Sequence, residues 1–454
     1  MTLRPAATRL FLFSAFFVLA MAACAPASAL AGVYNAQTAT LKNGMQVVVI
    51  PNHRTPALTH MIWYKSGAGD EPIGVSGTAH FMEHLMFKGT PTLGPGKFSE
   101  TVQRMGGEDN AFTSWDYTAY HETVPKDRLG DVMRMEADRM KNLTPTLPDI
   151  LHEKQVVMEE RRQNVESDPG VLLRERMNNV LFPNHPYGRP VIGWMPEMQG
   201  LRWVDALTFY KKWYAPDNAI LVVSGDTTLD QVLPLAEATY GKIPAQTLPH
   251  KGRPVSPVLE GEIAVIVQRE DIRQPSWQRE LRVPSAPENP DAALRLELLE
   301  DLFGGDTGRL YRELVVKQKI ATDVDVSYNP YARDDGTWLV YATPAPGVDM
   351  QKLAGAVNAV FENASVNGFT PQEVRAAITR MQDDAVYARD SLAGPAMRVG
   401  EALAVGVKLD DIESWPDRLE KLTPIDAQAA LNTYIAGKLG VSGFMIPLKV
   451  EGLM

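Results

Sequence analysis

The chain has 454 residues, of which 45% are apolar and 22% are charged. This length favours two or more domains with large buried cores, and this composition argues against a disordered or collagen-like chain. The formal net charge is −10, and the sequence contains no long basic run or basic-aromatic stripe. Nucleic acid is therefore not expected as a partner.

The first 31 residues have the layout of a secretory signal peptide. Arg4 and Arg9 precede an apolar run over residues 10–22, and residues 27–29 and 29–31 are both of the small A-x-A type that precedes cleavage. We therefore expect residues 1–31 to be removed and the mature protein to be periplasmic or secreted.

Cys24, the only cysteine, lies within this segment. Residues 21–24 leave open a lipoprotein signal with a lipid anchor on Cys24, but Met21 is a poor residue three positions before the cysteine, so simple cleavage is favoured. A mature chain without cysteine has no disulfides and no thiolate chemistry. Elsewhere no stretch is apolar over the roughly 20 residues that a membrane helix needs, so no membrane span is predicted.

The predicted elements form two mixed sets of strands and helices. In the first set, Asn43-Gly44 is a turn signal between two β-rich runs and predicts a hairpin that continues into a strand over 46–50. Sequence periodicity predicts further strands over 58–65 and 219–224, and helices over 97–105, 126–143, 148–166 and 229–240.

A stretch over 244–257 with four prolines and no apolar period is typical of a linker and separates the two sets. The second set is predicted to begin with a strand over 263–268 and to continue with helices over 292–303, 310–317, 349–363, 371–387 and 425–439. Each half runs to about 200 residues, which predicts two α+β domains of similar size.

The most informative motif is His80-Phe-Met-Glu83-His84. The two histidines are four residues apart on one face of a predicted helix, which Ser76 or Thr78 can cap, and Glu83 lies beside them. The remaining positions of this helix are apolar, so it should be buried, and buried ionisable side chains must be paired, neutralised or bound to metal. A buried His–Glu hydrogen-bonded pair is the alternative. The spacing favours a metal ion on both imidazoles, with Glu83 reaching a water on that ion.

A catalytic zinc site needs a third protein ligand. The best donors are Glu153 and Glu160, which are seven residues apart and share one face of a predicted helix. One of the two could bind the metal while the other orients a histidine ring. Glu159 and Arg162 in the same helix are better explained as a solvated pair.

These residues together resemble the inverzincin metallopeptidases of the pitrilysin family. The segments 85–90 and 106–113, and then Asp116, Thr118 and Tyr120, are also similar to the family. The similarity is clear over about the first two hundred residues and looser over the second half. Within the family, the chain is most similar to the branch that resembles the mitochondrial processing peptidase. The resemblance implies that this chain is a bacterial zinc-bearing subunit of that branch.

The resemblance implies two related α+β domains, each a mainly antiparallel sheet flanked by helices. The expected division is a signal peptide over 1–31, a zinc-binding peptidase domain over 32–245, a linker over 246–262, and a C-terminal domain of similar fold without a metal site over 263–454.

The resemblance also implies one Zn²⁺ per chain, bound by His80, His84 and Glu160, with Glu153 in support. A zinc-dependent endopeptidase is therefore expected, in which Glu83 accepts a proton from the attacking water and passes it to the leaving amine.

In the family, a peptide substrate adds as an extra strand to a segment that matches residues 110–113 here. The substrate-binding residues implied by this match are Asn110, Ala111, Phe112 and Thr113.

One departure from the family concerns its Arg and Tyr, seven residues apart in the second domain or a partner subunit. Val315 and Thr322 stand at these positions, and neither can donate hydrogen bonds as Arg and Tyr would. Arg309 or Arg312 with Tyr311 has the wrong spacing. We therefore expect a heterodimer in which a second pitrilysin-family subunit supplies the pair. A non-catalytic scaffold subunit is the alternative, although such members typically lose zinc residues that are present here.

Overall fold

The computed structural model describes residues 32–249 and 252–448. The predicted signal peptide and Cys24 lie outside the described residues. Within the part that is described, none of the helices has the length and apolar character that a membrane crossing would require.

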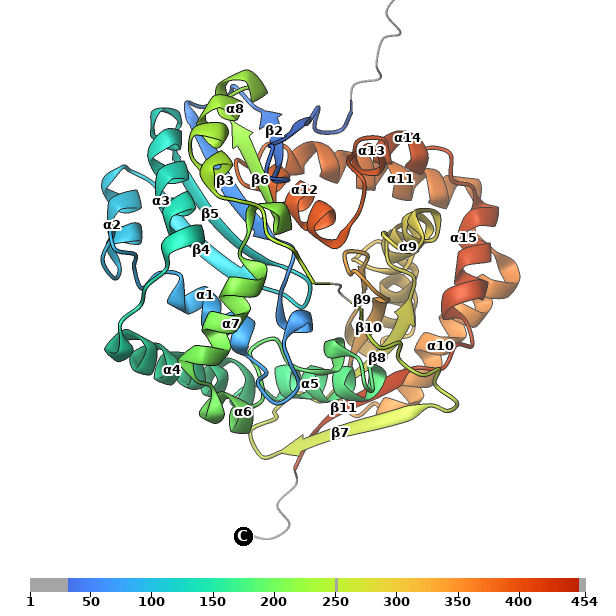
Figure 1. The fold of residues 1–454 in the computed structure, drawn as a ribbon. Coiled ribbons are helices and arrows are strands. Elements are labelled where there is room, and N and C mark those ends of the chain that lie inside the picture. Colours follow the sequence, from blue (N-terminus) through green and yellow to red (C-terminus); the bar gives the residue numbers. More distant parts are fainter. Residues whose placement is uncertain (1–31, 250–251, 449–454) are drawn as a thin grey trace, which may run out of the picture. The chain divides into compact units, whose positions relative to one another are not determined.

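Six strands form the first sheet, in the order β1-β2-β6-β3-β5-β4 (Figure 1). They are β1 (Gln37–Thr40), β2 (Gln46–Pro51), β3 (Ala57–Tyr64), β4 (Glu108–Thr113), β5 (Thr118–Pro125) and β6 (Ala219–Gly225). The β2–β6 pair is parallel and the other pairs are antiparallel. The predicted hairpin is present, because β1 and β2 pair across a turn in which Gly44 has a φ of 89°.

Five strands form the second sheet, in the order β7-β11-β8-β10-β9. They are β7 (Ile263–Arg269), β8 (Ser276–Val283), β9 (Ala321–Asn329), β10 (Gly336–Pro344) and β11 (Val441–Pro447). Only the β7–β11 pair is parallel among these described strands. The second sheet therefore repeats the order and directions of β2-β6-β3-β5-β4, and the predicted α+β fold with two mainly antiparallel sheets is confirmed.

Helices connect the strands of both halves. In the first half they are α1 (Thr78–Leu85), α2 (Lys97–Arg104), α3 (Leu129–Asn142), α4 (Leu147–Arg161), α5 (Pro169–Leu181), α6 (Met195–Gly200), α7 (Trp203–Trp213) and α8 (Leu229–Ala238). In the second half they are α9 (Pro290–Phe303), α10 (Met350–Asn367), α11 (Pro371–Ala388), α12 (Gly394–Val405), α13 (Leu409–Glu413), α14 (Trp415–Leu419) and α15 (Pro424–Ala430). The helix predicted over 310–317 is a π-helical turn instead, Tyr311–Lys317.

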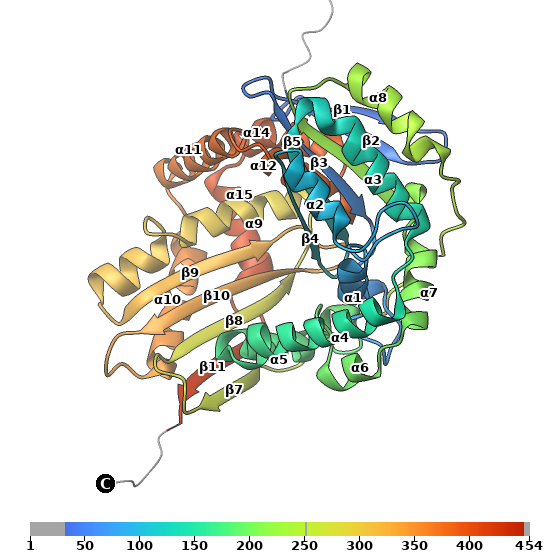
Figure 2. The same ribbon diagram turned by 90° about the vertical axis from the view of Figure 1, so that its left-hand side faces the viewer.

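Each half lends one helix to the sheet of the other half. Helix α12 from the second half packs on β3 and β6 of the first sheet, and α5 from the first half packs on β7 and β11 of the second. Figure 2 shows α5 lying along the second sheet. The opposite face of the first sheet carries a large apolar core that includes side chains of α1, α3 and α7. Helix α1 is therefore held on a sheet that is covered on both faces.

Candidate metal centre

Helix α1 carries the His80-Phe-Met-Glu83-His84 motif and begins without a side-chain cap of its own. Gly77 precedes the helix with a φ of 87°, and a Cβ there would lie 2.5 Å from the carbonyl oxygen of Ile192. Glycine is therefore required at this turn. The expectation that Ser76 or Thr78 caps the helix is wrong, because the Thr78 hydroxyl donates to Val75 and the Ser76 hydroxyl accepts from Trp194.

A buried carboxylate from outside the helix takes over this capping role. The two oxygens of Glu71 accept hydrogen bonds from the backbone N–H of Gly77 at 3.1 Å and of Ala79 at 2.7 Å. Burial raises the pKa of Glu71 to about 8, and these N–H donors act against that rise. Glu71 thereby fixes the start of the helix that presents His80.

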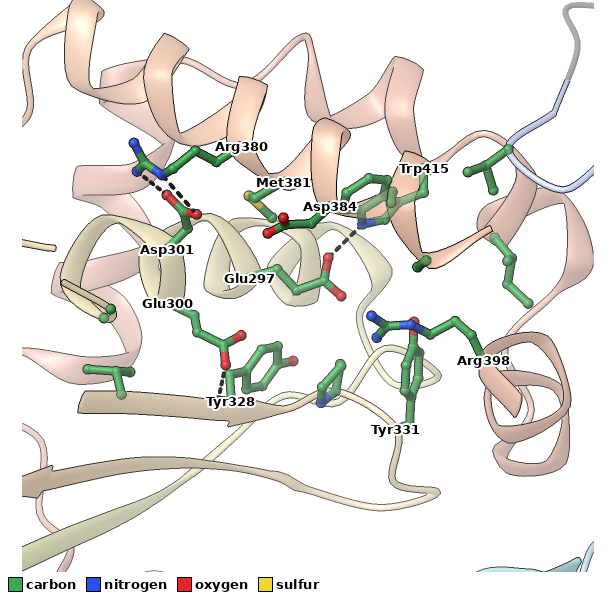
Figure 3. Close-up of a pocket in the computed structure, with 18 of the residues that line it drawn as sticks. Glu297, Glu300, Asp301, Tyr328, Tyr331, Arg380, Met381, Asp384, Arg398 and Trp415 are labelled. Atoms are coloured by element: carbon green, nitrogen blue, oxygen red, sulfur yellow. Dashed lines mark hydrogen bonds and ion pairs between the residues drawn. The ribbon is translucent and has the colours of Figure 1, made fainter. Parts of the chain in front are cut away.

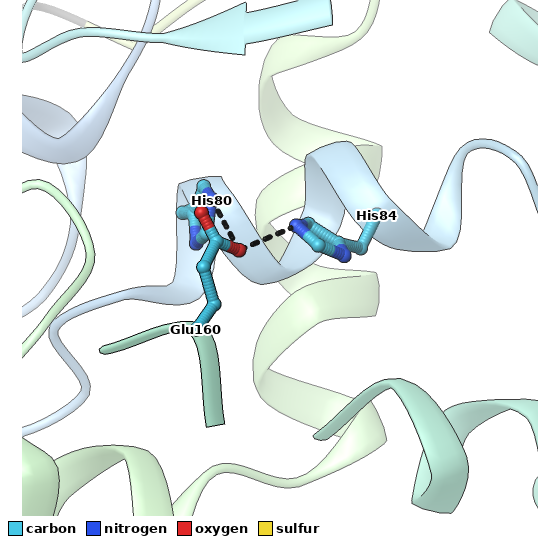
Figure 4. A group of neighbouring side chains, drawn as sticks. All are labelled: His80, His84 and Glu160. Carbon is cyan, nitrogen blue, oxygen red and sulfur yellow. Dashed lines mark ion pairs between the residues drawn. The ribbon is translucent and has the colours of Figure 1, made fainter. Parts of the chain in front are cut away.

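Three side chains from α1 and α4 converge on one point, as Figure 4 shows. Glu160 Oε2 lies 3.6 Å from His80 Nε2 and 3.3 Å from His84 Nε2. One donor atom from each residue lies within 4.8 Å of the others, and no other group of three or more His, Cys, Asp or Glu side chains in the described residues is arranged in this way. Donors about 2 Å from a tetrahedral zinc ion lie roughly 3.3 Å apart, so this set has the spacing that zinc needs.

The electrostatics of the cluster also suit a cation. Burial and the neighbouring His84 lower the pKa of His80 to about 4, so this imidazole is neutral and able to act as a ligand. Burial acts to lower the pKa of His84 as well, but hydrogen bonds to Glu153 and Glu160 raise it to about 9. The cluster thus stabilises one positive charge, the proton on His84, and its two imidazole nitrogens and one carboxylate oxygen are donors that zinc prefers.

Glu153 lies behind His84 rather than among the three converging atoms. Its Oε2 is 3.2 Å from His84 Nδ1, and its Oε1 is 2.6 Å from Lys88 Nζ. A carboxylate on Nδ1 orients the ring and directs Nε2 toward the metal position. The ion pair of Lys88 with Glu153 was not predicted from the sequence, although Lys88 lies only four residues after His84.

Glu83 is largely buried and points toward strand β4. Thr113 Oγ1 donates a hydrogen bond to Glu83 Oε2 at 2.5 Å. Burial raises the pKa of Glu83, and the Thr113 hydrogen bond opposes this rise. A carboxylate with these properties can accept a proton and later release it.

The predicted substrate segment, residues 110–113, lies in β4 at the free edge of the first sheet. Asn110 is exposed and Ala111 is partly exposed. The ring of Phe112 packs against Trp63 on the face covered by α12, with ring centroids 5.3 Å apart. Thr113 points to the metal centre instead, where it contacts Glu83. The structure therefore divides this segment between two environments.

The capping role of Glu71 was not predicted from the sequence, because no local pattern indicates it. It is separated from the motif by a loop with two glycines, and its role follows only from the fold. By contrast, the predicted solvated pair of Glu159 and Arg162 is present at the surface, with an N–O distance of 2.9 Å.

Two family descriptions match this chain. Residues 46–194 match "Insulinase (Peptidase family M16)", and residues 205–381 match "Peptidase M16 inactive domain". The zinc protease PqqE of Helicobacter pylori is 31% identical over 344 residues, which cover 74% of this chain and 76% of that protein.

Solved structures share the fold. The crystal structure of a protease from Helicobacter pylori superimposes with a TM-score of 0.84 at 27% identity, covering 90% of this chain and 99% of that one. The first half of the periplasmic protease PqqL from Escherichia coli superimposes with a TM-score of 0.77 at 21% identity, covering 92% of this chain and 93% of that one. Because M16 family models match both halves of the chain, and a zinc protease is 31% identical over 74% of it, this chain belongs to peptidase family M16.

Proposed function

We propose that this protein is a zinc-dependent endopeptidase. The observation that carries the proposal is the convergence of His80 Nε2, His84 Nε2 and Glu160 Oε2 on one point, with the Glu83 carboxylate beside them. These three side chains would bind one Zn²⁺, and Glu153 would hold the ring of His84. When bound, zinc supplies a Lewis acid that polarises a peptide carbonyl and lowers the pKa of a water molecule.

In this proposal Glu83 carries the proton. Its carboxylate accepts the proton of the attacking water and later delivers it to the amine that leaves. Thr113 holds one oxygen of Glu83, so the other oxygen is left to face the reacting water. Because burial raises the pKa of Glu83, this carboxylate takes up a proton more readily than an exposed one, which suits a group that must accept and release a proton.

The free edge of β4 supports the peptide-binding part of the proposal. Strand β4 pairs only with β5 among the described strands, so the N–H and C=O groups of its other edge can bind an extended peptide. Asn110 and Ala111 would then lie along the peptide, with Thr113 close to the scissile bond. Main-chain pairing of this kind tolerates many substrate sequences.

We propose further that a second M16 subunit completes the site. Val315 is partly buried against the second core and Thr322 lies on β9 with its hydroxyl 3.5 Å from Thr343 O, so neither offers a cationic donor. Arg309 is bound to Glu373 at 3.0 Å and is therefore not free to take this role. This supports a heterodimer of the processing-peptidase-like branch.

The localisation and the domain division also remain proposals. The leader-like sequence over 1–31 supports a periplasmic or secreted protein, and the likeness to a periplasmic M16 protease from Escherichia coli is compatible with it. The division into domains 32–245 and 263–454, with a linker over 246–262, is supported by the ranges of the two sheets.

The proposal is tested with purified protein, alone and together with a second M16 subunit encoded in the same organism. Zinc content should be about one per chain, and an unstructured peptide should be cleaved. Glu83→Gln should keep the zinc and lower the cleavage rate by about 10³-fold, whereas His84→Ala should lose both. His152→Ala, which alters an exposed histidine on α4, is the matched control.

Two outcomes would count against the proposal. Zinc-loaded protein that cleaves nothing even with its partner would indicate a scaffold subunit, and unchanged cleavage by Glu83→Gln would remove the assigned base. Full cleavage by this chain alone would refute only the heterodimer.

A further inference from the structure

A cavity of about 580 Å³ lies mainly in the second half (Figure 3). It is lined by α9, α11, α12, α14, β9 and the loop after β9, and by Val33 and Tyr34 near the start of the described chain. None of its lining residues belongs to the metal centre. This volume is within the range of about 300–1,000 Å³ that small-ligand sites occupy. Five carboxyl groups, two guanidinium groups and four aromatic rings line it: Glu297, Glu300, Asp301, Asp325, Asp384, Arg380, Arg398, Tyr34, Tyr328, Tyr331 and Trp415.

Part of this polar lining is already engaged within the protein. Arg380 forms an ion pair with Asp301. Asp325 Oδ1 accepts hydrogen bonds from the backbone N–H of Gly305 at 2.9 Å and of Val326 at 2.8 Å. These groups have their partners, so they shape the cavity and are not the groups left to recognise a ligand.

Other polar groups of the cavity keep free bonding capacity. Arg398 is exposed and forms no ion pair with any described residue; its guanidinium donates a hydrogen bond to the Tyr34 hydroxyl and lies 5.9 Å from the centre of the Tyr331 ring, which leaves further N–H donors for a ligand. Glu297 accepts one hydrogen bond, from Trp415 Nε1 at 2.6 Å, and Glu300 accepts one, from the backbone N–H of Tyr328 at 3.0 Å. Each of these two carboxylates thus has a second oxygen for a ligand.

Figure 3 shows Glu297, Glu300 and Arg398 facing the same space, with the guanidinium on one side and the two carboxylates across from it. This arrangement offers separate positions for a negative and a positive group of one molecule. Burial, together with neighbours that include Glu297, raises the pKa of Glu300 to about 7, so an added cation near it would be stabilised. Aromatic rings between the charged groups provide apolar contact.

We propose that this cavity binds a short peptide with free termini, with its α-carboxylate on Arg398 and its α-ammonium group between Glu297 and Glu300. A lone anion fits poorly because five carboxyl groups line the space. A metal ion is disfavoured because these carboxylates do not converge as the three ligands of the metal centre do. The site goes beyond the proposed peptidase function and does not require catalysis.

The test uses three matched probes on the full-length Glu83→Gln protein, which should leave peptides intact. Trialanine, N-acetyl-trialanine and trialanine amide are titrated by isothermal calorimetry. Trialanine should bind, and blocking either terminus should weaken binding by about tenfold, because each block removes one charge-assisted contact.

Variants then assign each terminus to its side chain. Arg398→Gln should weaken trialanine about tenfold and leave the binding of trialanine amide unchanged, since the amide has no carboxylate to lose. Glu300→Gln should likewise weaken the binding of trialanine by about tenfold. It should leave the binding of N-acetyl-trialanine unchanged, since this probe has no ammonium group. Arg375→Gln removes an exposed charge from the outer side of α11 and is the matched control.

Equal affinity for the three probes, or no binding of trialanine, would overturn the proposal. So would binding that Arg398→Gln does not change, because it would place the peptide at the metal centre or elsewhere. If a variant does not fold, the series of three probes on the parent protein decides alone. A protein that cleaves no peptide could still bind trialanine here, so this proposal and the peptidase proposal fail separately.

Discussion

The two sheets share one strand order, but their central strands present opposite chemistry to the helix that covers them. Strand β3 presents Met61 and Trp63 to α12 within an apolar core. Strand β8 presents Ser276, Gln278 and Glu280 to α5; all three are at most 5% exposed, and each has a buried oxygen without a hydrogen-bond partner among the described residues.

The difference concerns the sheet face that each borrowed helix covers. The first sheet is apolar on the face under α12. Its other face, which carries α1 and α3, combines a large apolar core with a buried ionic network of His60, Glu122, Glu136 and Arg139. The helix that carries His80 and His84 therefore stands on a close-packed support. The second sheet carries no comparable metal cluster within the described residues and tolerates polar side chains under its borrowed helix. The face under a borrowed helix is therefore compatible with either chemistry, and among the described residues the metal cluster belongs to the half in which that face is apolar.

The largest effect on stability is expected from Trp63→Ala. Trp63 is 1% exposed, and Gly400 of α12 lies so close that a Cβ there would be 2.1 Å from the indole nitrogen. Removing the ring leaves a cavity under α12 and should lower the free energy of unfolding by about 3–5 kcal/mol. Chemical denaturation measures this loss, with the exposed Val204→Ala as control. Gln278→Ala should cost clearly less, so equal losses at the two positions would contradict the contrast between the sheets.

Glu280 makes the polar face of the second sheet sensitive to pH. Burial raises its pKa from the ordinary 4.5 to about 7. The folded protein then holds this proton more tightly than the unfolded chain between about pH 4.5 and 7, so the free energy of unfolding falls as pH rises through this window. The contribution is at most about 3 kcal/mol.

Glu280→Gln removes this titration. The difference in unfolding free energy between the natural protein and Glu280→Gln should therefore move in favour of the variant between pH 5 and pH 7.5, as measured by denaturation at both pH values. A difference that stays constant would show that Glu280 is ionised throughout, paired with a group such as Arg174.

These features also explain how far sequence reasoning reaches. The hairpin at Asn43-Gly44 and the strand Ala219–Gly225 could be predicted because turn residues and a continuous apolar run are local signals. Strand β8 was not predicted, since Arg279 interrupts its apolar positions and the polar residues on its other face give no local sign that this face is buried.

For the candidate site the limit lies between local spacing and tertiary contact. His80, Glu83 and His84 are recognisable because their chemistry is written into one helical turn. The support given by Glu71, and the hydrogen bond from Thr113 to Glu83, arise from segments that meet only after folding. No spacing rule connects such residues, so the sequence could supply the donors of the site but only part of the support around them.

Glu153→Gln tests whether the first half holds its metal through this support. The change removes the charged partner of His84 Nδ1 and of Lys88. Zinc affinity, measured by competition with a chelator, should fall by about 10–100-fold while the stoichiometry stays at one. Glu159→Gln on the exposed side of the same helix, and Glu300→Gln in the second half, should leave the affinity unchanged. A loss of affinity with Glu300→Gln would contradict the assignment of the metal to the first half alone.

The smallest expected effect is that of Gln278→Met, which gives the second sheet the apolar character of the first. Gln278 is 4% exposed, and its Oε1 is buried without a partner among the described residues. Methionine has a similar shape, so the change removes the cost of burying an unpaired carbonyl and should raise the free energy of unfolding by about 1 kcal/mol. Met61→Gln is the reverse change in the first sheet and should lower it by about 1–3 kcal/mol. Because both variants keep side-chain volume, denaturation curves compare them directly. A clear loss of stability with Gln278→Met would mean that its amide is bound by ordered water under α5, and the polar face would then be a stabilising feature rather than a tolerated one.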